Sequence, residues 1–205
     1  MLQATGLECV RGDRTLFRDV SFALQAGTLM HVHGPNGSGK TSLLRILAGL
    51  SSPAAGEVRW NGTPLAAAGD EYRAALAYLG HLNAIKDDLS AVENLVVSER
   101  MAGLQIDAGD ARDALARLGL ARSADLPTRV LSQGQKRRVA LARLLLRGAC
   151  RLWVLDEPFV ALDTAAVRTV QGVIEAQLAA GGIVVYTTHQ DVEIETPSRQ
   201  SLALQ

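Results

Sequence analysis

Apolar and polar residues alternate through most of the first 30 positions, with a break at Arg11-Gly12-Asp13. Alternation with a period of two, together with a turn-forming break, predicts short antiparallel strands. A further strand is expected over residues 57–60, which precede the turn pair Asn61-Gly62. Between these regions, a strand-like run over residues 29–33 enters a glycine-rich loop, and a helical pattern then covers residues 41–50. The first 62 residues therefore predict an antiparallel region interrupted by a strand, a loop and a helix.

Residues 90–148 have a helical pattern instead. Two pairs have the spacing of a capping box, in which each residue's side chain bonds the other's free backbone N–H group: Ser90 with Glu93, and Ser132 with Gln135. Each pair predicts the start of a helix, and another helix is expected between residues 107 and 119. We expect the basic residues 136–138 of the last helix to form a solvated face without a ligand.

Strand character returns in residues 152–155 and 183–187, on either side of a helical pattern over residues 164–180. Two apolar strands joined by a helix predict a parallel βαβ unit. The predicted fold class is therefore α/β, with a mainly parallel core sheet, an N-terminal antiparallel β subdomain and an inserted helical subdomain at about residues 84–148. We expect a single domain over residues 1–205, because no repeat or long linker interrupts the chain.

Composition and charge narrow the range of partners. The chain is 48% hydrophobic, and its 21 Lys and Arg residues equal its 21 Asp and Glu residues, so the zero net charge predicts no nucleic-acid partner. The only cysteines, Cys9 and Cys150, have the spacing of neither a disulfide framework nor a zinc site. No segment resembles a signal peptide or a membrane span. We therefore expect a cytoplasmic protein without direct membrane insertion.

The glycine-rich loop matches the pattern GxxxxGK[ST] at every fixed position and lies between a predicted strand and a predicted helix. Its residues are the first candidates for phosphate binding: Gly34, Pro35, Asn36, Gly37, Ser38, Gly39, Lys40 and Thr41. Glycines let successive backbone N–H groups face phosphate oxygens, and the helix N-terminus adds a partial positive charge. Lys40 is expected to reach the β- and γ-phosphates and Thr41 to bind Mg²⁺. The alternative is an ordinary glycine-rich loop.

Two carboxylates, Asp156 and Glu157, follow the apolar residues 152–155 at the carboxyl end of a predicted central strand. This edge of an α/β sheet is where ligands bind. We expect Asp156 to hold Mg²⁺ and Glu157 to polarise the water that attacks the γ-phosphate. Adjacent acids at a strand exit also occur in solvated turns, which is the alternative.

Residues 131–135, Leu-Ser-Gln-Gly-Gln, resemble the LSGGQ signature of the ABC ATPase family and precede Asp156 as in that family. The resemblance implies a P-loop NTPase fold with a RecA-like core, ATP as the nucleotide and a homodimer that sandwiches ATP. It implies that Ser132, Gly134 and Gln135 engage the nucleotide bound by the opposite copy. It also places Asp163 in the D-loop. Ser132 has a second possible role in capping its own helix, which is compatible with ligand binding.

Three further positions are assigned by the same resemblance. His189, after residues 186–188, occupies the position of the switch histidine that senses the γ-phosphate. His81 stands where the family usually carries a glutamine that contacts Mg²⁺ and the attacking water, and an imidazole accepts or donates only one hydrogen bond at a time. Arg11 stands near the position of the aromatic residue that commonly stacks on adenine. A guanidinium plane can stack on a base in its place.

The sequences Tyr-Leu-Gly-His at residues 78–81 and Leu-Trp-Val-Leu-Asp-Glu-Pro-Phe at residues 152–159 are similar to those of the CcmA family. Members of that family are the ATP-binding subunits of the haem exporter of bacterial cytochrome c biogenesis. The resemblance implies CcmB-like and CcmC-like integral membrane permease partners. It also implies a peripheral location on the cytoplasmic face of the inner (plasma) membrane. The chain has no CxxCH motif, so the sequence shows no haem contact of its own.

Other functions remain open from the sequence. The nearest alternative is the ATPase subunit of another ABC transporter, either an importer or an exporter. A soluble ABC ATPase acting on DNA or ribosomes would need coiled-coil arms, a second ATPase domain or a basic surface. A phosphate-loop kinase of small metabolites would have no use for the signature helix or the switch histidine.

Overall fold

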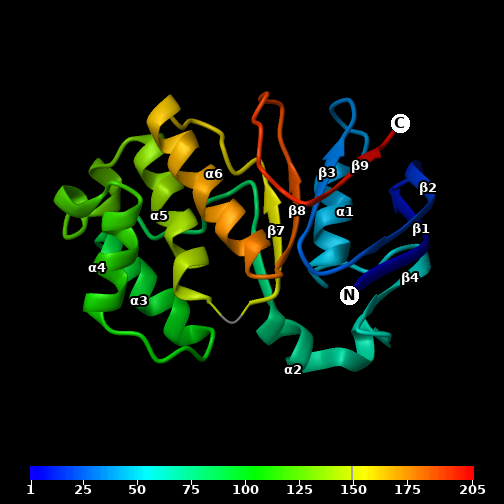
Figure 1. Cartoon of the computed structure of the whole chain (residues 1–205), viewed down its shortest axis with the longest axis horizontal. Coiled ribbons are helices and arrows are strands. Elements are labelled where there is room, and N and C mark those ends of the chain that lie inside the picture. Colours follow the sequence, from blue (N-terminus) through cyan, green and yellow to red (C-terminus); the bar gives the residue numbers. More distant parts are fainter. Residues whose placement is uncertain (149) are drawn as a thin grey trace. The chain divides into compact units, whose positions relative to one another are not determined.

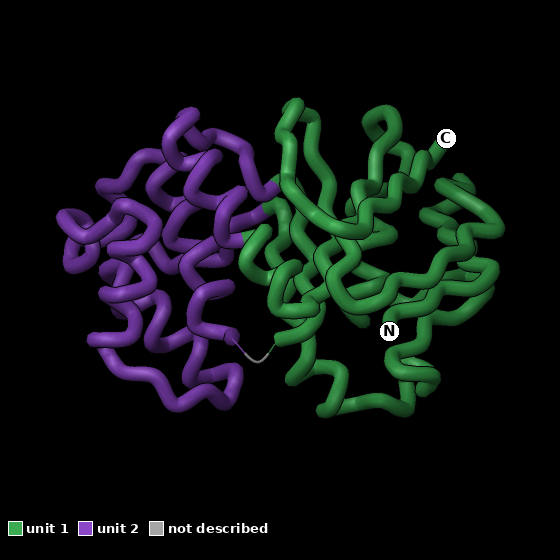
Figure 2. The backbone as a smooth tube through the Cα atoms, viewed as in Figure 1, with its two compact units in different colours: residues 1–81, 149–157, 174–205 green, residues 82–148, 158–173 purple. Residues whose placement is uncertain are grey.

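The computed structural model describes residues 1–148 and 150–205 (Figure 1). The chain divides into two compact units, which Figure 2 distinguishes by colour. The first unit contains residues 1–81, 149–157 and 174–205, and the second contains residues 82–148 and 158–173. The segment expected to form a helical insertion, at about residues 84–148, lies within the second unit. The second unit also contains residues 158–173, which the sequence did not assign to it.

The first unit contains a four-stranded sheet with the order β2-β1-β4-β5. Its strands are β1 (Leu2–Arg11), β2 (Arg14–Leu24), β4 (Ala55–Trp60) and β5 (Thr63–Pro64), and all its pairings are antiparallel. Asn61 and Gly62 both have positive φ, as the tight turn between β4 and β5 requires. The predicted antiparallel region is therefore confirmed.

The first unit also contains a five-stranded parallel sheet with the order β6-β7-β8-β3-β9. Its strands are β3 (Thr28–His33), β6 (Leu76–Leu79), β7 (Leu152–Asp156), β8 (Ile183–Thr187) and β9 (Ser198–Ala203). Strand β9 lies beside β3, with Thr28 opposite Ser198 and His33 opposite Ala203 (Figure 1). The sequence did not predict β9, because Ser-Arg-Gln-Ser-Leu-Ala has no apolar run.

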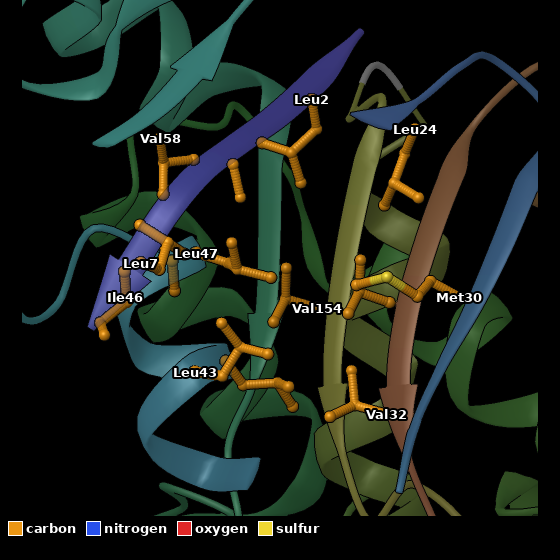
Figure 3. Close-up of a cluster of buried hydrophobic side chains, with 14 of the residues drawn as sticks. Leu2, Leu7, Leu24, Met30, Val32, Leu43, Ile46, Leu47, Val58 and Val154 are labelled. Atoms are coloured by element: carbon orange, nitrogen blue, oxygen red, sulfur yellow. The ribbon is translucent and has the colours of Figure 1, made fainter. Parts of the chain in front are cut away.

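Helix α1 (Lys40–Leu47) joins the cores of the two sheets. Its buried side chains Leu43, Ile46 and Leu47 belong to one cluster with Leu7 of β1 and Val154 of β7 (Figure 3). Burying a leucine of this kind contributes about 2 kcal/mol to the stability of the fold. This packing holds α1, and therefore the loop that precedes it, against both sheets. Helix α2 (Leu65–Ala75), which was not predicted, follows β5 and buries Tyr72.

The second unit is mainly helical, with α3 (Ala91–Met101), α4 (Ala108–Arg117), α5 (Gln133–Leu146) and two short 3₁₀ turns, η1 (Ala121–Ser123) and η2 (Thr128–Val130). Helix α6 (Thr164–Ala179) crosses the boundary between the units after residue 173. Both predicted capping boxes are present, at the start of α3 and of α5. Among the described residues, no helix combines the length and the apolar character needed to cross a membrane.

One expectation for the second unit is wrong. Residues 136–138 do not form a solvated face, because the side chain of Arg137 is buried, with 1% of the residue exposed. Its Nη1 donates a hydrogen bond to Oδ1 of Asn83 at 3.0 Å, and Nζ of Lys136 pairs with Oδ1 of Asp87 at 2.7 Å. A buried guanidinium is stable only when it is paired or hydrogen-bonded, and sequence periodicity does not reveal such a partner.

Candidate functional site

The glycine-rich loop connects the end of β3 to the start of α1, as predicted. Gly34, Gly37 and Gly39 have φ values of 147°, 82° and 96°. A Cβ on Gly39 would lie 2.9 Å from Cδ1 of Phe17, and a Cβ on Gly34 would lie 2.2 Å from the backbone oxygen of Leu204. Gly34 and Gly39 therefore require glycine for both conformation and space, and Gly37 for conformation. The contact with Leu204 shows that the chain after β9 helps to shape the loop.

Polar groups in the loop match the needs of a phosphate ligand. Nζ of Lys40 donates to the backbone oxygens of Gly34 and Pro35 at 2.8 and 3.0 Å, which holds the ammonium group across the loop. Oγ of Ser38 is buried and has no hydrogen-bond partner among the described residues. A buried hydroxyl without a partner is uncommon and marks a place where a ligand can bond. The loop therefore fits a polyphosphate chain.

Asp156 ends β7 and is held from two sides. Its Oδ2 accepts a hydrogen bond from Oγ1 of Thr41 at 2.8 Å, and its Oδ1 accepts one from Oγ1 of Thr187 at 2.8 Å. Only 2% of Asp156 is exposed, so its orientation is fixed. Burial and, less strongly, the negative charge of Asp156 raise the pKa of the nearby Tyr78 hydroxyl. The two residues predicted to bind Mg²⁺, Thr41 and Asp156, are therefore in direct contact.

Sequence reasoning did not select Thr187. This residue is opposite Asp156 in the parallel register of β7 and β8. Its Oγ1 also accepts a hydrogen bond from the backbone N–H of Glu157 at 3.0 Å, so one hydroxyl orients both carboxylate residues. The available signal was a threonine at the end of the strand next to the one that carries the two acids.

Glu157 and His189 are neighbours at the same end of the parallel sheet. Nε2 of His189 lies 3.6 Å from Oε1 of Glu157, and the backbone N–H of His189 donates to Oε2 at 3.3 Å. Glu157 has a φ of 52°, an unusual backbone conformation for a residue with a side chain. The chain therefore directs the Glu157 carboxylate towards the switch-histidine position.

These groups line one cavity of about 630 Å³ in the first unit. The lining residues are Arg14, Leu16, Asn36, Gly37, Gly39, Lys40, Thr41, Ser42, His81, Asp156, Glu157 and His189. Gly34, Pro35 and Ser38 belong to the loop but not to this lining. The cavity thus combines a phosphate loop with two carboxylates and two imidazoles. This arrangement can bind a nucleotide triphosphate and supply a general base to a water molecule.

The predicted signature residues lie in the second unit, whereas the cavity is lined entirely by residues of the first. Oγ of Ser132 accepts a hydrogen bond from the backbone N–H of Gln135 at 3.2 Å, and the Gln135 side chain accepts one from the N–H of Ser132 at 2.8 Å. A Cβ on Gly134 would lie 2.4 Å from the backbone oxygen of Ala161. Oδ1 of Asp163 accepts a hydrogen bond from the N–H of Ala166 at 2.7 Å.

Comparison with known proteins identifies the family. The family model for ABC transporters matches residues 17–160. The chain is 55% identical over 203 residues to the cytochrome c biogenesis ATP-binding export protein CcmA of Nitrosospira multiformis, covering 99% of this chain and 98% of the relative. The CcmA of Nitrosomonas europaea is also 55% identical, with 100% and 95% covered. The chain belongs to the CcmA family of ABC transporter proteins.

Solved structures support the fold of this CcmA-family chain. A putative ABC transporter ATP-binding protein from Pyrococcus furiosus has a TM-score of 0.83 at 26% identity, with 98% of this chain and 96% of that chain covered. A dimeric ATP-binding cassette in a post-hydrolysis state, bound to ADP and Pi, has a TM-score of 0.80 at 23% identity, with 93% and 88% covered. The predicted ABC ATPase fold class is therefore confirmed.

Two positions that depart from the general ABC pattern have different places in this CcmA-family structure. His81 lines the cavity together with Asp156 and Glu157. Arg11 does not line it, although Arg14 and Leu16 from the start of β2 do. In the β1–β2 register Arg11 is directly opposite Arg14, three residues along the chain. The stacking role of Arg11 stays a prediction, and the structure brings two other residues of this hairpin to the cavity.

Proposed function

We propose that this chain hydrolyses ATP as the ATP-binding subunit of the haem exporter of cytochrome c biogenesis. Membership of the CcmA family supports the export system, and one structural observation supports the chemistry. The phosphate loop and the carboxylates Asp156 and Glu157 converge in one cavity at the carboxyl end of a parallel sheet. The reaction is the transfer of the γ-phosphoryl group of ATP to water, which yields ADP and phosphate.

The phosphate loop binds the polyphosphate chain of ATP. Backbone N–H groups of the loop residues other than Pro35 face the phosphates, and Lys40 binds the β- and γ-phosphate oxygens. The Oγ1 atom of Thr41 and the carboxylate of Asp156, already in contact, are the residues that would hold Mg²⁺. When bound, the metal ion would neutralise the charge that develops on the phosphates.

Glu157 is the proposed general base that accepts a proton from the attacking water. The backbone N–H of His189 holds its carboxylate, and the imidazole, which lines the same cavity, is proposed to contact the γ-phosphate. Thr187 fixes the backbone of Glu157 and the side chain of Asp156. His81 lines the same cavity and is proposed to orient the water from the position where other ABC ATPases carry glutamine.

Two copies of the chain are proposed to close on ATP. The N-terminus of α5 presents Ser132, Gly134 and Gln135 to the nucleotide of the opposite copy, and Asp163 contributes from its position directly before α6. This use of a helix N-terminus follows from its free N–H groups and partial positive charge. Closure of the dimer is the step that does mechanical work on the membrane partner.

The proposed partners are CcmB-like and CcmC-like permease subunits of the inner membrane. The chain itself would bind peripherally on the cytoplasmic face. Specificity for haem is assigned to the membrane subunits.

The decisive experiment uses the Glu157→Gln variant in the complex with the native membrane subunits. Loss of the general base should lower the ATPase rate by about 100-fold or more, while ATP still binds and the two copies remain associated. Turnover at the wild-type rate would contradict the role of Glu157. Purification with a solute-importing permease, and without CcmB-like protein, would contradict the haem-exporter assignment.

A further inference from the structure

The cavity contains a second permanent positive charge besides Lys40. Among the described residues that line it, only Lys40 and Arg14 carry such a charge. Arg14 is the first residue of β2, and its Nη1 lies 4.0 Å from the position that a Cβ on Gly37 would occupy. The guanidinium group is therefore next to the middle of the phosphate loop, although it comes from a different sheet.

The Arg14 guanidinium makes no hydrogen bond or ion pair with another described residue. The guanidinium group of Arg18, four positions along the same strand, is hydrogen-bonded instead. Its Nε bonds Oε1 of Glu8 at 2.7 Å and its Nη2 bonds Oγ1 of Thr15, and it does not line the cavity. Two arginines of one strand are thus distinguished by their partners, and only Arg14 is available to a ligand.

The charge balance of the cavity favours a role for Arg14. Asp156 and Glu157 place two carboxylates in the same cavity as Lys40, so the summed formal charge of these three groups is negative. A guanidinium beside the loop offsets that charge. It can also donate two parallel hydrogen bonds to phosphate oxygens, a geometry that lysine does not provide.

We infer that Arg14 is a phosphate-binding residue of the nucleotide site, acting on the polyphosphate chain from the side of the β1–β2 hairpin. The inference rests on the proposed function, because it assigns a further ligand to the same nucleotide. It differs from the role expected for Arg11, since Arg14 contacts phosphate rather than the base. Leu16, which also lines the cavity two residues later, provides the apolar surface on that side.

The test compares Arg14→Ala with Arg18→Ala in the full-length chain. Both variants remove one arginine from β2, but only Arg14 lines the cavity. Binding of ATP and of inorganic tripolyphosphate is measured by calorimetry at low ionic strength, and thermal unfolding checks the fold. Arg14→Ala should weaken the binding of both ligands by about tenfold. Arg14→Lys should weaken them less, and Arg18→Ala should leave both affinities unchanged.

Tripolyphosphate separates the two possible contacts because it has no base. If Arg14→Ala weakened ATP binding but not tripolyphosphate binding, Arg14 would contact the base and the inference would be wrong. Unchanged binding of both ligands, or equal loss in Arg18→Ala, would also overturn it. The wild-type chain and Lys40→Ala test the proposed function separately. If wild type bound ATP and Lys40→Ala bound it much more weakly, the nucleotide site of the proposed function would stand whatever the result for Arg14.

Discussion

The two units prepare their functional residues in opposite ways. In the first unit, Asp156 is oriented by Thr41 and Thr187 and lines, with Lys40, a cavity that a ligand can fill. In the second, the side chains of Ser132 and Gln135 each accept a hydrogen bond from the other's backbone N–H group, which completes a capping box. The first unit is therefore a preformed ligand site. The second presents a complete helix N-terminus, which we propose binds the nucleotide of another copy.

The interiors of the two units also differ, in how far buried charged groups contribute to them. The first unit is held by an apolar core in which α1 lies between two sheets (Figure 3). The second buries charged groups, including Arg137 and Glu99, with 1% and 0% of each residue exposed. Nε of Arg147 bonds Oε2 of Glu99 at 2.6 Å, and Nη2 of Arg143 donates to the backbone oxygen of Ala84 at 2.6 Å. Buried polar pairs fix the orientation of α5 more narrowly than apolar packing would.

Removing the ammonium group of the phosphate loop should have the strongest effect on nucleotide binding. Lys40→Ala should weaken ATP binding by about 100-fold, because a charge-assisted contact with the phosphates is lost. Calorimetry on the isolated chain measures the ATP affinity of the variant. Lys136→Ala is the matched control in the second unit, where Lys136 pairs with Asp87. That change should leave ATP affinity as it is and cost about 0.5 kcal/mol of stability. Equal loss of affinity in both variants would contradict the division of roles.

A second prediction concerns the buried carboxylate of the helical unit. Arg147→Met should lower the free energy of unfolding by about 3 kcal/mol, because Glu99 would remain buried without its closest cation. Urea unfolding followed by circular dichroism measures the change. The double variant Arg147→Met/Glu99→Gln removes the charge as well as its partner, so it should recover part of the loss. A loss below about 1 kcal/mol in the single variant would show that the pair is not needed.

The sequence predicted the parts of the site that depend on local pattern. The phosphate loop, both capping boxes and the position of Asp156 and Glu157 at a strand end all follow from residues close together in the chain. What it missed depends on pairing between distant segments. Thr187 is placed by the register of β7 and β8. Strand β9 is polar and forms only because it pairs with β3, and Leu204 beyond it packs into the core and meets Gly34. The partner of Arg137 is 54 residues away, which no periodicity reveals.

Helices α3 and α5 of the second unit begin with the same capping box, so the roles of their two N-cap serines can be compared directly. Ser90→Ala and Ser132→Ala should each lower the free energy of unfolding by about 1 kcal/mol, since each removes an N-cap. Only Ser132→Ala should also reduce the ATP-dependent association of two copies, measured by light scattering in the Glu157→Gln background. The shared cost in stability makes Ser90→Ala the control for helix fraying. If both variants impaired association equally, the signature serine would have no role beyond capping its own helix.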